Sequence, residues 1–141
     1  MILLDTDHMS ILRMPPSQRQ TRLVARMSLP SNELFKIPLV VVEETMRSWL
    51  AAIAKERIPL RQVSAYRELS SIFAFFAAFP VTPFGQAAAD RFELLRTAKV
   101  RIATRDLKIA AICLANDAML LTANRQDFEK VPGLRFETWL S

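Results

Sequence analysis

The chain has 141 residues, enough for one domain with a hydrophobic core, and its 51% hydrophobic content excludes a disordered protein. Its apolar runs are shorter than the roughly 18–20 residues of a membrane span, and its single cysteine excludes an internal disulfide and is typical of a reducing compartment. The net charge of +5, from 19 Lys and Arg against 14 Asp and Glu, favours polyanionic partners. Since we recognise no signal peptide, we expect one cytoplasmic domain, residues 1–141, without membrane contact.

Short buried strands alternate with helices in the first half of the chain. A strand is predicted at residues 1–4, and a helix at 8–14, where two prolines end it. Residues 18–29 form a second helix with an apolar stripe. The β-branched run "IPLVVV" at 37–42 predicts a second buried strand, and a helix is predicted to follow at 43–55.

The second half continues this alternation. Helices are predicted at 59–79, 85–99 and 104–116, and strands at 79–84, 118–122 and 134–137. The strands are continuously hydrophobic rather than alternating, which is typical of a parallel sheet covered on both faces. We therefore expect a three-layer α/β/α domain with a central, mostly parallel sheet.

Acidic side chains follow the predicted strands. Asp5 follows the first strand and Glu44 the second, while Asp106 opens the helix that leads to the strand ending at Thr122. Two further polar residues come after that strand, Asn124 and Asp127. Because the carboxyl ends of parallel strands meet at one edge of a sheet, we expect these side chains to lie together.

Carboxylates gathered in one pocket repel unless a cation neutralises them, and the sequence places no Lys or Arg where it would obviously pair with Asp5. One histidine and one cysteine make a zinc site improbable, whereas oxygen ligands favour Mg²⁺ or Mn²⁺. Such a site can activate water against a phosphodiester. Alternatively, Glu44 and Asp106 only stabilise helix dipoles.

Three stretches resemble the PIN domain and, more narrowly, the VapC-type toxins of bacterial type II toxin–antitoxin pairs. They are "LLDTDHMS", "VVVEETMRSWL" and "RDLKIAAICLANDAMLLTANRQDFEKVPGL", and together they cover the chain in order. The resemblance implies a Mg²⁺- or Mn²⁺-dependent ribonuclease whose first three acids fall on Asp5, Glu44 and Asp106. Its fourth position falls on Asn124 or Asp127, with Thr122 in support. It also implies a homodimer and a VapB-like antitoxin.

Several other residues receive structural predictions. We expect Asp7 to cap the first helix, His8 to be a helix-surface or hydrogen-bonded residue, and Cys113 to be a core residue. The apolar run 71–79 is expected to contribute to a dimer contact. Five arginines are candidates to hold RNA phosphates: Arg13, Arg47, Arg101, Arg105 and Arg125.

Two other classes of protein compete with the ribonuclease. A catalytically silent PIN-like module would bind RNA or a partner without cutting, and the retained acids argue against it. A phosphoacceptor receiver domain also gathers acids at strand ends, but it needs an acid ending its middle strand and a lysine ending its last. The segments "FPVTPF" and "LRFETWL" supply neither.

Overall fold

The computed structural model describes residues 1–140 and contains a five-stranded sheet in which every strand pairing is parallel. The strands are β1 (Ile2–Leu4), β2 (Phe35–Pro38), β3 (Val81–Thr82), β4 (Met119–Leu121) and β5 (Phe136–Glu137). Their order is β3-β2-β1-β4-β5. Strands β2 and β3 lie on one side of β1, and β4 and β5 lie on the other. The order of the strands therefore reverses between β1 and β4, which is a topological switch point.

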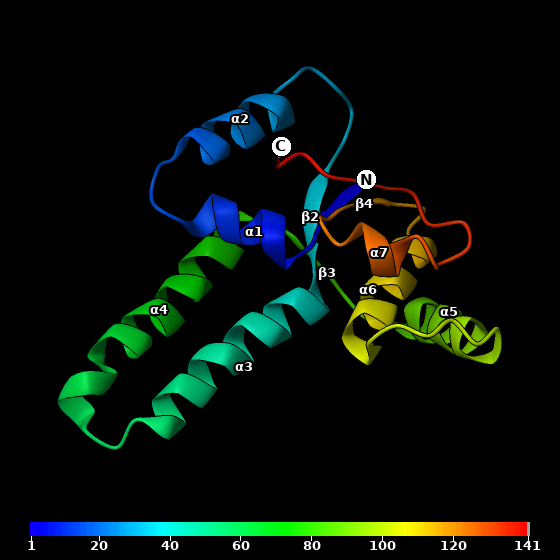
Figure 1. The fold of residues 1–141 in the computed structure, drawn as a ribbon. Helices are drawn as coiled ribbons and strands as arrows, with labels where there is room; N and C mark the ends of the chain where they lie inside the picture. Colours follow the sequence, from blue (N-terminus) through cyan, green and yellow to red (C-terminus); the bar gives the residue numbers. More distant parts are fainter. Residues whose placement is uncertain (141) are drawn as a thin grey trace.

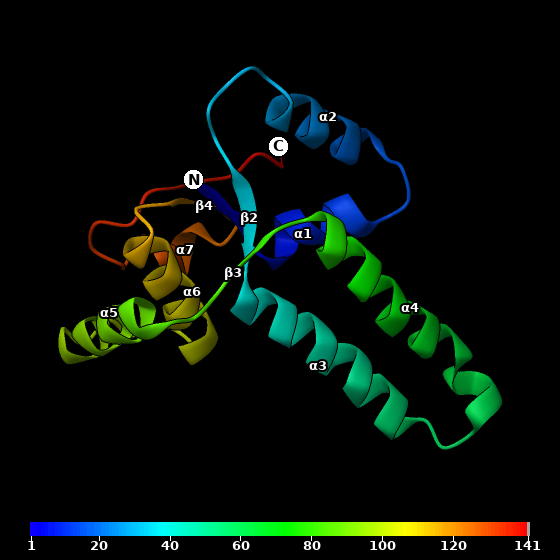
Figure 2. The ribbon, with the colours of Figure 1, turned by 180° about the vertical axis from the view of Figure 1, so that it is seen from behind.

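Seven helices surround this sheet in residues 1–140: α1 (Thr6–Arg13), α2 (Gln18–Met27), α3 (Leu39–Lys55), α4 (Pro59–Ala78), α5 (Gln86–Thr97), α6 (Thr104–Ala115) and α7 (Arg125–Phe128). Figures 1 and 2 show α1 and α2 on one side of the strands and α5 and α6 on the other. Helices α3 and α4 form a long hairpin that extends away from the sheet (Figure 1). This arrangement confirms the predicted three-layer α/β/α domain. None of these helices is long and apolar enough to cross a membrane.

The core lies around the two central strands. Leu3 and Leu4 of β1 and Leu120 and Leu121 of β4 are fully buried, and Ile109 of α6 belongs to the same cluster. Burial on both faces explains why these strands are continuously hydrophobic. Helix α6 also contains Cys113, which is buried as predicted, and burial raises the pKa of its thiol.

Several predicted elements are longer than the observed ones and α7 was not predicted, but two boundaries that differ bear on the edge of the sheet. The run predicted as a strand at 37–42 leaves the sheet at Pro38, and α3 begins at Leu39 instead of Glu43. Val40 and Val41 are buried from the first turn of this helix. A short apolar run has no periodicity that separates a buried strand from the start of a buried helix, which is why the prediction was wrong there.

The first helix begins directly after β1, at Thr6 rather than at residue 8. Asp5 is consequently the residue that caps it, and its carboxylate accepts a hydrogen bond from the Thr6 backbone N–H at 2.7 Å. The prediction that Asp7 caps this helix is therefore wrong, because Asp7 already lies in the first turn. This early start turns the chain at the edge of the sheet and keeps both acids there.

The aromatic run at 71–79 belongs to α4 and its C-terminal end. Phe75, Phe76 and Phe79 are partly buried against the core, and the rings of Phe75 and Phe79 stack at 5.6 Å. Phe73 remains exposed. Most of this surface is thus used within the chain, and the dimer contact stays a prediction that rests on Phe73 and its neighbours.

Candidate functional site

The switch point between β1 and β4 positions Asp5. Leu4 pairs with Leu121, so Asp5 and Thr122 leave their strands side by side, and the Asp5 N–H donates to the Leu121 carbonyl at 2.9 Å. The Thr122 hydroxyl donates to Asp5 Oδ2 at 2.8 Å. Asp5 is only 3% exposed, although it is a carboxylate at the edge of a sheet.

The charge of Asp5 is poorly compensated. Burial raises the pKa of Asp5, and the nearby carboxylate of Asp7 raises it further. Hydrogen bonds from Thr6 and Thr122 and the charge of Arg105 oppose these effects, but the pKa of Asp5 stays above its ordinary value. A carboxylate in this condition gains more from a nearby cation than a solvated carboxylate does.

Asp106 and Glu44 are joined by one arginine. Asp106 lies in the first turn of α6, is 4% exposed, and accepts hydrogen bonds from Arg105 Nη2 at 2.8 Å and Nε at 3.2 Å. Arg105 Nη1 donates to the Glu44 carboxylate, 61 positions away in the sequence. Glu44 is more open, with 41% of its side chain exposed.

Arg105 changes the electrostatic balance that the sequence predicted. The sequence placed no Lys or Arg where it would obviously pair with Asp5, but the Arg105 guanidinium bridges Glu44 and Asp106 and lies close enough to lower the pKa of Asp5. Burial alone would lower the pKa of Arg105, but the two carboxylates raise this pKa above its ordinary value. In this structure Arg105 pairs with acids of its own chain, and its role in holding RNA phosphates stays a prediction.

Asp7 belongs to the same edge, which the sequence analysis missed. Its Oδ2 accepts a hydrogen bond from the Ala123 N–H at 2.8 Å, just after β4. The ring of His8 contacts the other oxygen at 2.6 Å. Burial raises the pKa of Asp7, but these hydrogen bonds lower it by more, so that the pKa lies below its ordinary value. Because the chain turns into a helix directly after Asp5, both Asp5 and Asp7 stay at this edge.

His8 connects this edge to the C-terminal segment. It is fully buried, and its Nε2 accepts a hydrogen bond from the Trp139 N–H at 3.0 Å. Since Nε2 is an acceptor, the ring proton lies on Nδ1 and is donated to Asp7. Of the two roles predicted for His8, a helix-surface residue or a hydrogen-bonded one, the structure confirms the second.

The segment after β4 contains the two candidates for the fourth position of the site, Asn124 and Asp127. The Asn124 N–H donates to the Thr122 hydroxyl at 3.1 Å, so Asn124 is linked to Asp5 through Thr122. The Asn124 side chain donates to Asp127 Oδ2 at 3.1 Å and caps α7. Asp127 thus orients Asn124, and Lys130 approaches its carboxylate at 3.9 Å.

The remaining arginine candidates lie in different places. Arg13 lines a pocket beside Glu44, whereas the exposed side chains of Arg47 and Arg125 pair with acids one helical turn away. Arg101 is exposed before α6. Arg47 nevertheless lines a second pocket with Glu44 and Arg105, so the structure gathers Arg13, Arg47 and Arg105 around Glu44.

The donor chemistry fits a hard divalent cation. Asp5, Asp106 and Glu44 offer carboxylate oxygens, the ligands that Mg²⁺ and Mn²⁺ prefer, and Asp5 and Asp106 are almost inaccessible to water. Within residues 1–140, no three His, Cys, Asp and Glu side chains already form a cluster ready for a metal ion. The Arg105 guanidinium lies between Glu44 and Asp106, so a cation bound by both would displace it.

The all-parallel sheet with its switch point, three layers and acidic carboxyl edge define the PIN-like fold, as the sequence resemblance predicted. No family model and no curated protein matches the chain. Solved structures do: VapBC-1 from nontypeable Haemophilus influenzae has a TM-score of 0.74 at 18% identity, with 100% of both chains covered. DNA-bound VapBC from Salmonella typhimurium has a TM-score of 0.73 at 19% identity, covering 98% of this chain and 97% of that one. FitAcB from Neisseria gonorrhoeae has a TM-score of 0.67 at 24% identity, with 99% of both chains covered. These similarities establish the fold.

Proposed function

We propose that this chain is a metal-dependent endoribonuclease that acts in the cytoplasm as the toxin of a toxin–antitoxin pair. The observation that carries the proposal is a pair of almost inaccessible carboxylates, Asp5 and Asp106, at the carboxyl edge of a parallel sheet, with the more open Glu44 beside them. Buried acids at this edge are disfavoured in a purely structural role and favoured where a cation is bound. The fold shared with the VapBC structures supports the same conclusion.

Asp5, Asp106 and Glu44 would hold Mg²⁺ or Mn²⁺. A bound metal of this kind lowers the pKa of an attacking water and offsets the charge that develops on the phosphate. Thr122 keeps Asp5 Oδ2 in place through its 2.8 Å hydrogen bond. Glu44, the most exposed of the three acids, would complete the set of metal ligands or accept a proton of the water. Arg105, once released from Glu44 and Asp106, would be free to bind a phosphate oxygen of the RNA.

The proposed partners follow from the same resemblance. They are an RNA substrate, a VapB-like antitoxin and a second copy of the chain. The similar structures from Haemophilus influenzae and Salmonella typhimurium are VapBC complexes, and the second is bound to DNA, which supports an antitoxin partner. Neutralisation of the acidic edge by a basic antitoxin side chain would follow the arrangement that Arg105 already makes within the chain.

The deciding experiment compares RNA cleavage by the purified protein in Mg²⁺ or Mn²⁺ and in EDTA. We expect cleavage only with metal, and loss of cleavage in the variants Asp5→Asn and Asp106→Asn. The matched control is Asp117→Asn, because Asp117 is fully exposed in a turn whose positive φ of 48° asparagine also tolerates. Full activity in EDTA, or unimpaired cleavage by both site variants, would overturn the proposal.

A catalytically silent binding module is the second candidate. The bridge from Arg105 to Glu44 and Asp106 favours it, because this ion pair neutralises the two acids without a metal. Such a module would bind RNA or a protein partner with equal affinity in Mg²⁺ and in EDTA and would leave the RNA intact. The same metal titration therefore separates the two functions.

A further inference from the structure

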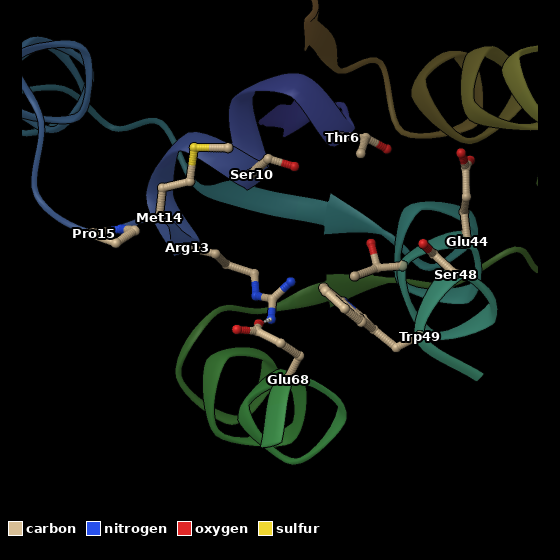
Figure 3. Close-up of a pocket in the computed structure, with 10 residues that line it drawn as sticks. Thr6, Ser10, Arg13, Met14, Pro15, Glu44, Ser48, Trp49 and Glu68 are labelled. Carbon is tan, nitrogen blue, oxygen red and sulfur yellow. Dashed lines mark ion pairs between the residues drawn. The ribbon is translucent and has the colours of Figure 1, made fainter. Parts of the chain in front are cut away.

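A pocket of about 400 Å³ opens beside the acids, between α1, α3 and α4 (Figure 3). Thr6 and Glu44 line it and also belong to the acidic edge, where both accept hydrogen bonds from Arg105. The pocket is thus continuous with the site at which an RNA phosphate would be cut. A substrate held at the carboxylates would have its neighbouring nucleotide beside this pocket.

The pocket combines a flat aromatic surface with polar groups. Figure 3 shows the Trp49 ring reaching from α3 toward Arg13 on α1, with Ser10 and Ser48 around the same opening. Within residues 1–140, the hydroxyls of Ser10 and Ser48 make no side-chain hydrogen bond and so are free to bind a ligand. The remaining walls include the apolar side chain of Met14.

Arg13 is held in position on one wall. Its guanidinium donates to the Ser71 hydroxyl at 3.1 Å and forms an ion pair with Glu68 at 3.5 Å. Because Glu68 balances the charge of Arg13, this wall offers both hydrogen-bond donors and an acceptor without an excess of positive charge. That combination suits the neutral edge of a base better than it suits a phosphate, which would require uncompensated cations.

We propose that this pocket binds one base of the RNA, next to the scissile phosphate, and that it determines which nucleotide flanks the cut. Trp49 stacks on the face of the base, while Arg13, Ser10 and Ser48 bind its edge. Proteins recognise single-stranded RNA through this pairing of aromatic stacking with hydrogen bonds to base edges. The volume lies within the range of about 300–1,000 Å³ of small-ligand sites. The inference rests on the proposed function, because the pocket matters for cleavage only if the acids cut RNA.

The first test measures binding without cleavage. The chain has two tryptophans, and Trp139 contacts Glu137, Phe35 and Arg26 instead of lining the pocket. In EDTA, RNA dinucleotides should quench the fluorescence of the wild-type protein to saturation, and Trp139→Phe should retain this quenching whereas Trp49→Phe should lose it. Absence of saturable quenching in the wild type, its persistence in Trp49→Phe, or equal quenching by inorganic phosphate would overturn the proposal.

The second test reads the bases at the cleavage ends by RNA sequencing. Trp49→Leu keeps an apolar side chain but removes the stacking surface, so we expect it to lower cleavage roughly 5- to 150-fold and to flatten the base preference beside the cut. Arg13→Gln should change which base is preferred. The matched control is Tyr66→Ala, since Tyr66 is an exposed aromatic on α4 that does not line the pocket, and its base preference should equal that of the wild type.

The two tests separate this inference from the proposed function. If RNA quenches Trp49 but no variant and no metal supports cleavage, the pocket binds bases and the ribonuclease proposal fails. If the wild type cleaves with a base preference that Trp49→Leu and Arg13→Gln leave unchanged, the ribonuclease stands and the base pocket is refuted.

Discussion

Arg105→Gln tests whether the guanidinium occupies the place of a cation. In the absence of metal, the variant loses the charged hydrogen bonds to the buried Asp106 and an ion pair with the half-exposed Glu44. Hydrogen bonds to a charged group are worth about 1.5–3 kcal/mol, and a solvent-exposed pair adds about 0–1 kcal/mol. We therefore expect the free energy of unfolding in EDTA to fall by about 2–3 kcal/mol, which lowers the melting temperature by roughly 5–10 °C.

Magnesium should reverse this loss. In the wild type, a cation that binds Glu44 and Asp106 must first displace Arg105, whereas in the variant these carboxylates are unpaired. We expect the variant to bind Mg²⁺ roughly 5- to 30-fold more tightly, equivalent to about 1–2 kcal/mol of relieved competition. Added Mg²⁺ should consequently raise the melting temperature of Arg105→Gln more than that of the wild type.

Thermal unfolding and calorimetric Mg²⁺ titration measure both effects, with Arg96→Gln as the matched control. Arg96 pairs with Glu93 on α5, away from the acids, and 68% of its side chain is exposed, so its loss should change stability by less than about 1 kcal/mol and leave Mg²⁺ binding unchanged. The reasoning is refuted if Arg105→Gln binds Mg²⁺ no more tightly than the wild type does, or if its stability in EDTA is unaltered.

Three other predictions concern the acids and the oligomer. The pKa of Asp5 is raised in the folded state, so protonated Asp5 favours the fold below its ordinary pKa, and this contribution is lost as pH rises through the folded-state pKa. At pH 7 in EDTA, Asp5→Asn should therefore have a higher melting temperature than the wild type. An unchanged or lower melting temperature would contradict this. Asp7 has a lowered pKa, so Asp7→Asn should lose about 1–3 kcal/mol at pH 7, and denaturant unfolding should show this difference shrinking as pH falls below 4. Light scattering at micromolar concentrations should detect a dimer, and Phe73→Ser should weaken it; a wild type that stays monomeric would exclude that contact.

The sequence by itself determined the fold class. Continuous apolar runs between amphipathic helices predict strands buried on both faces, and the sheet is parallel throughout as that pattern requires. The turns at Asp117 and Gly133 also follow from local chemistry, since both residues adopt positive φ. The strand predicted at 37–42 was misplaced because an apolar run of six residues satisfies a buried strand and the first turn of a buried helix equally well.

The candidate site was predictable only in its acids. Asp5 follows the central strand and Asp106 opens the helix before β4, so the rule that the carboxyl ends of parallel strands meet at one edge suffices to bring them together. The same rule does not show the neighbours that set their charges. Arg105 is adjacent to Asp106 in sequence, yet its contact with Glu44 depends on where α3 leaves the sheet relative to α6.

Only the tertiary structure decided the remaining features. Asp7 bonds to Ala123 across 116 positions, and the pocket beside Glu44 is assembled from three helices. Local propensity and hydrophobic pattern depend on residues a few positions apart, so they specify helices, strands and buried faces. Contacts between distant side chains depend on strand order and on the packing of whole helices, and these exist only once the chain has folded.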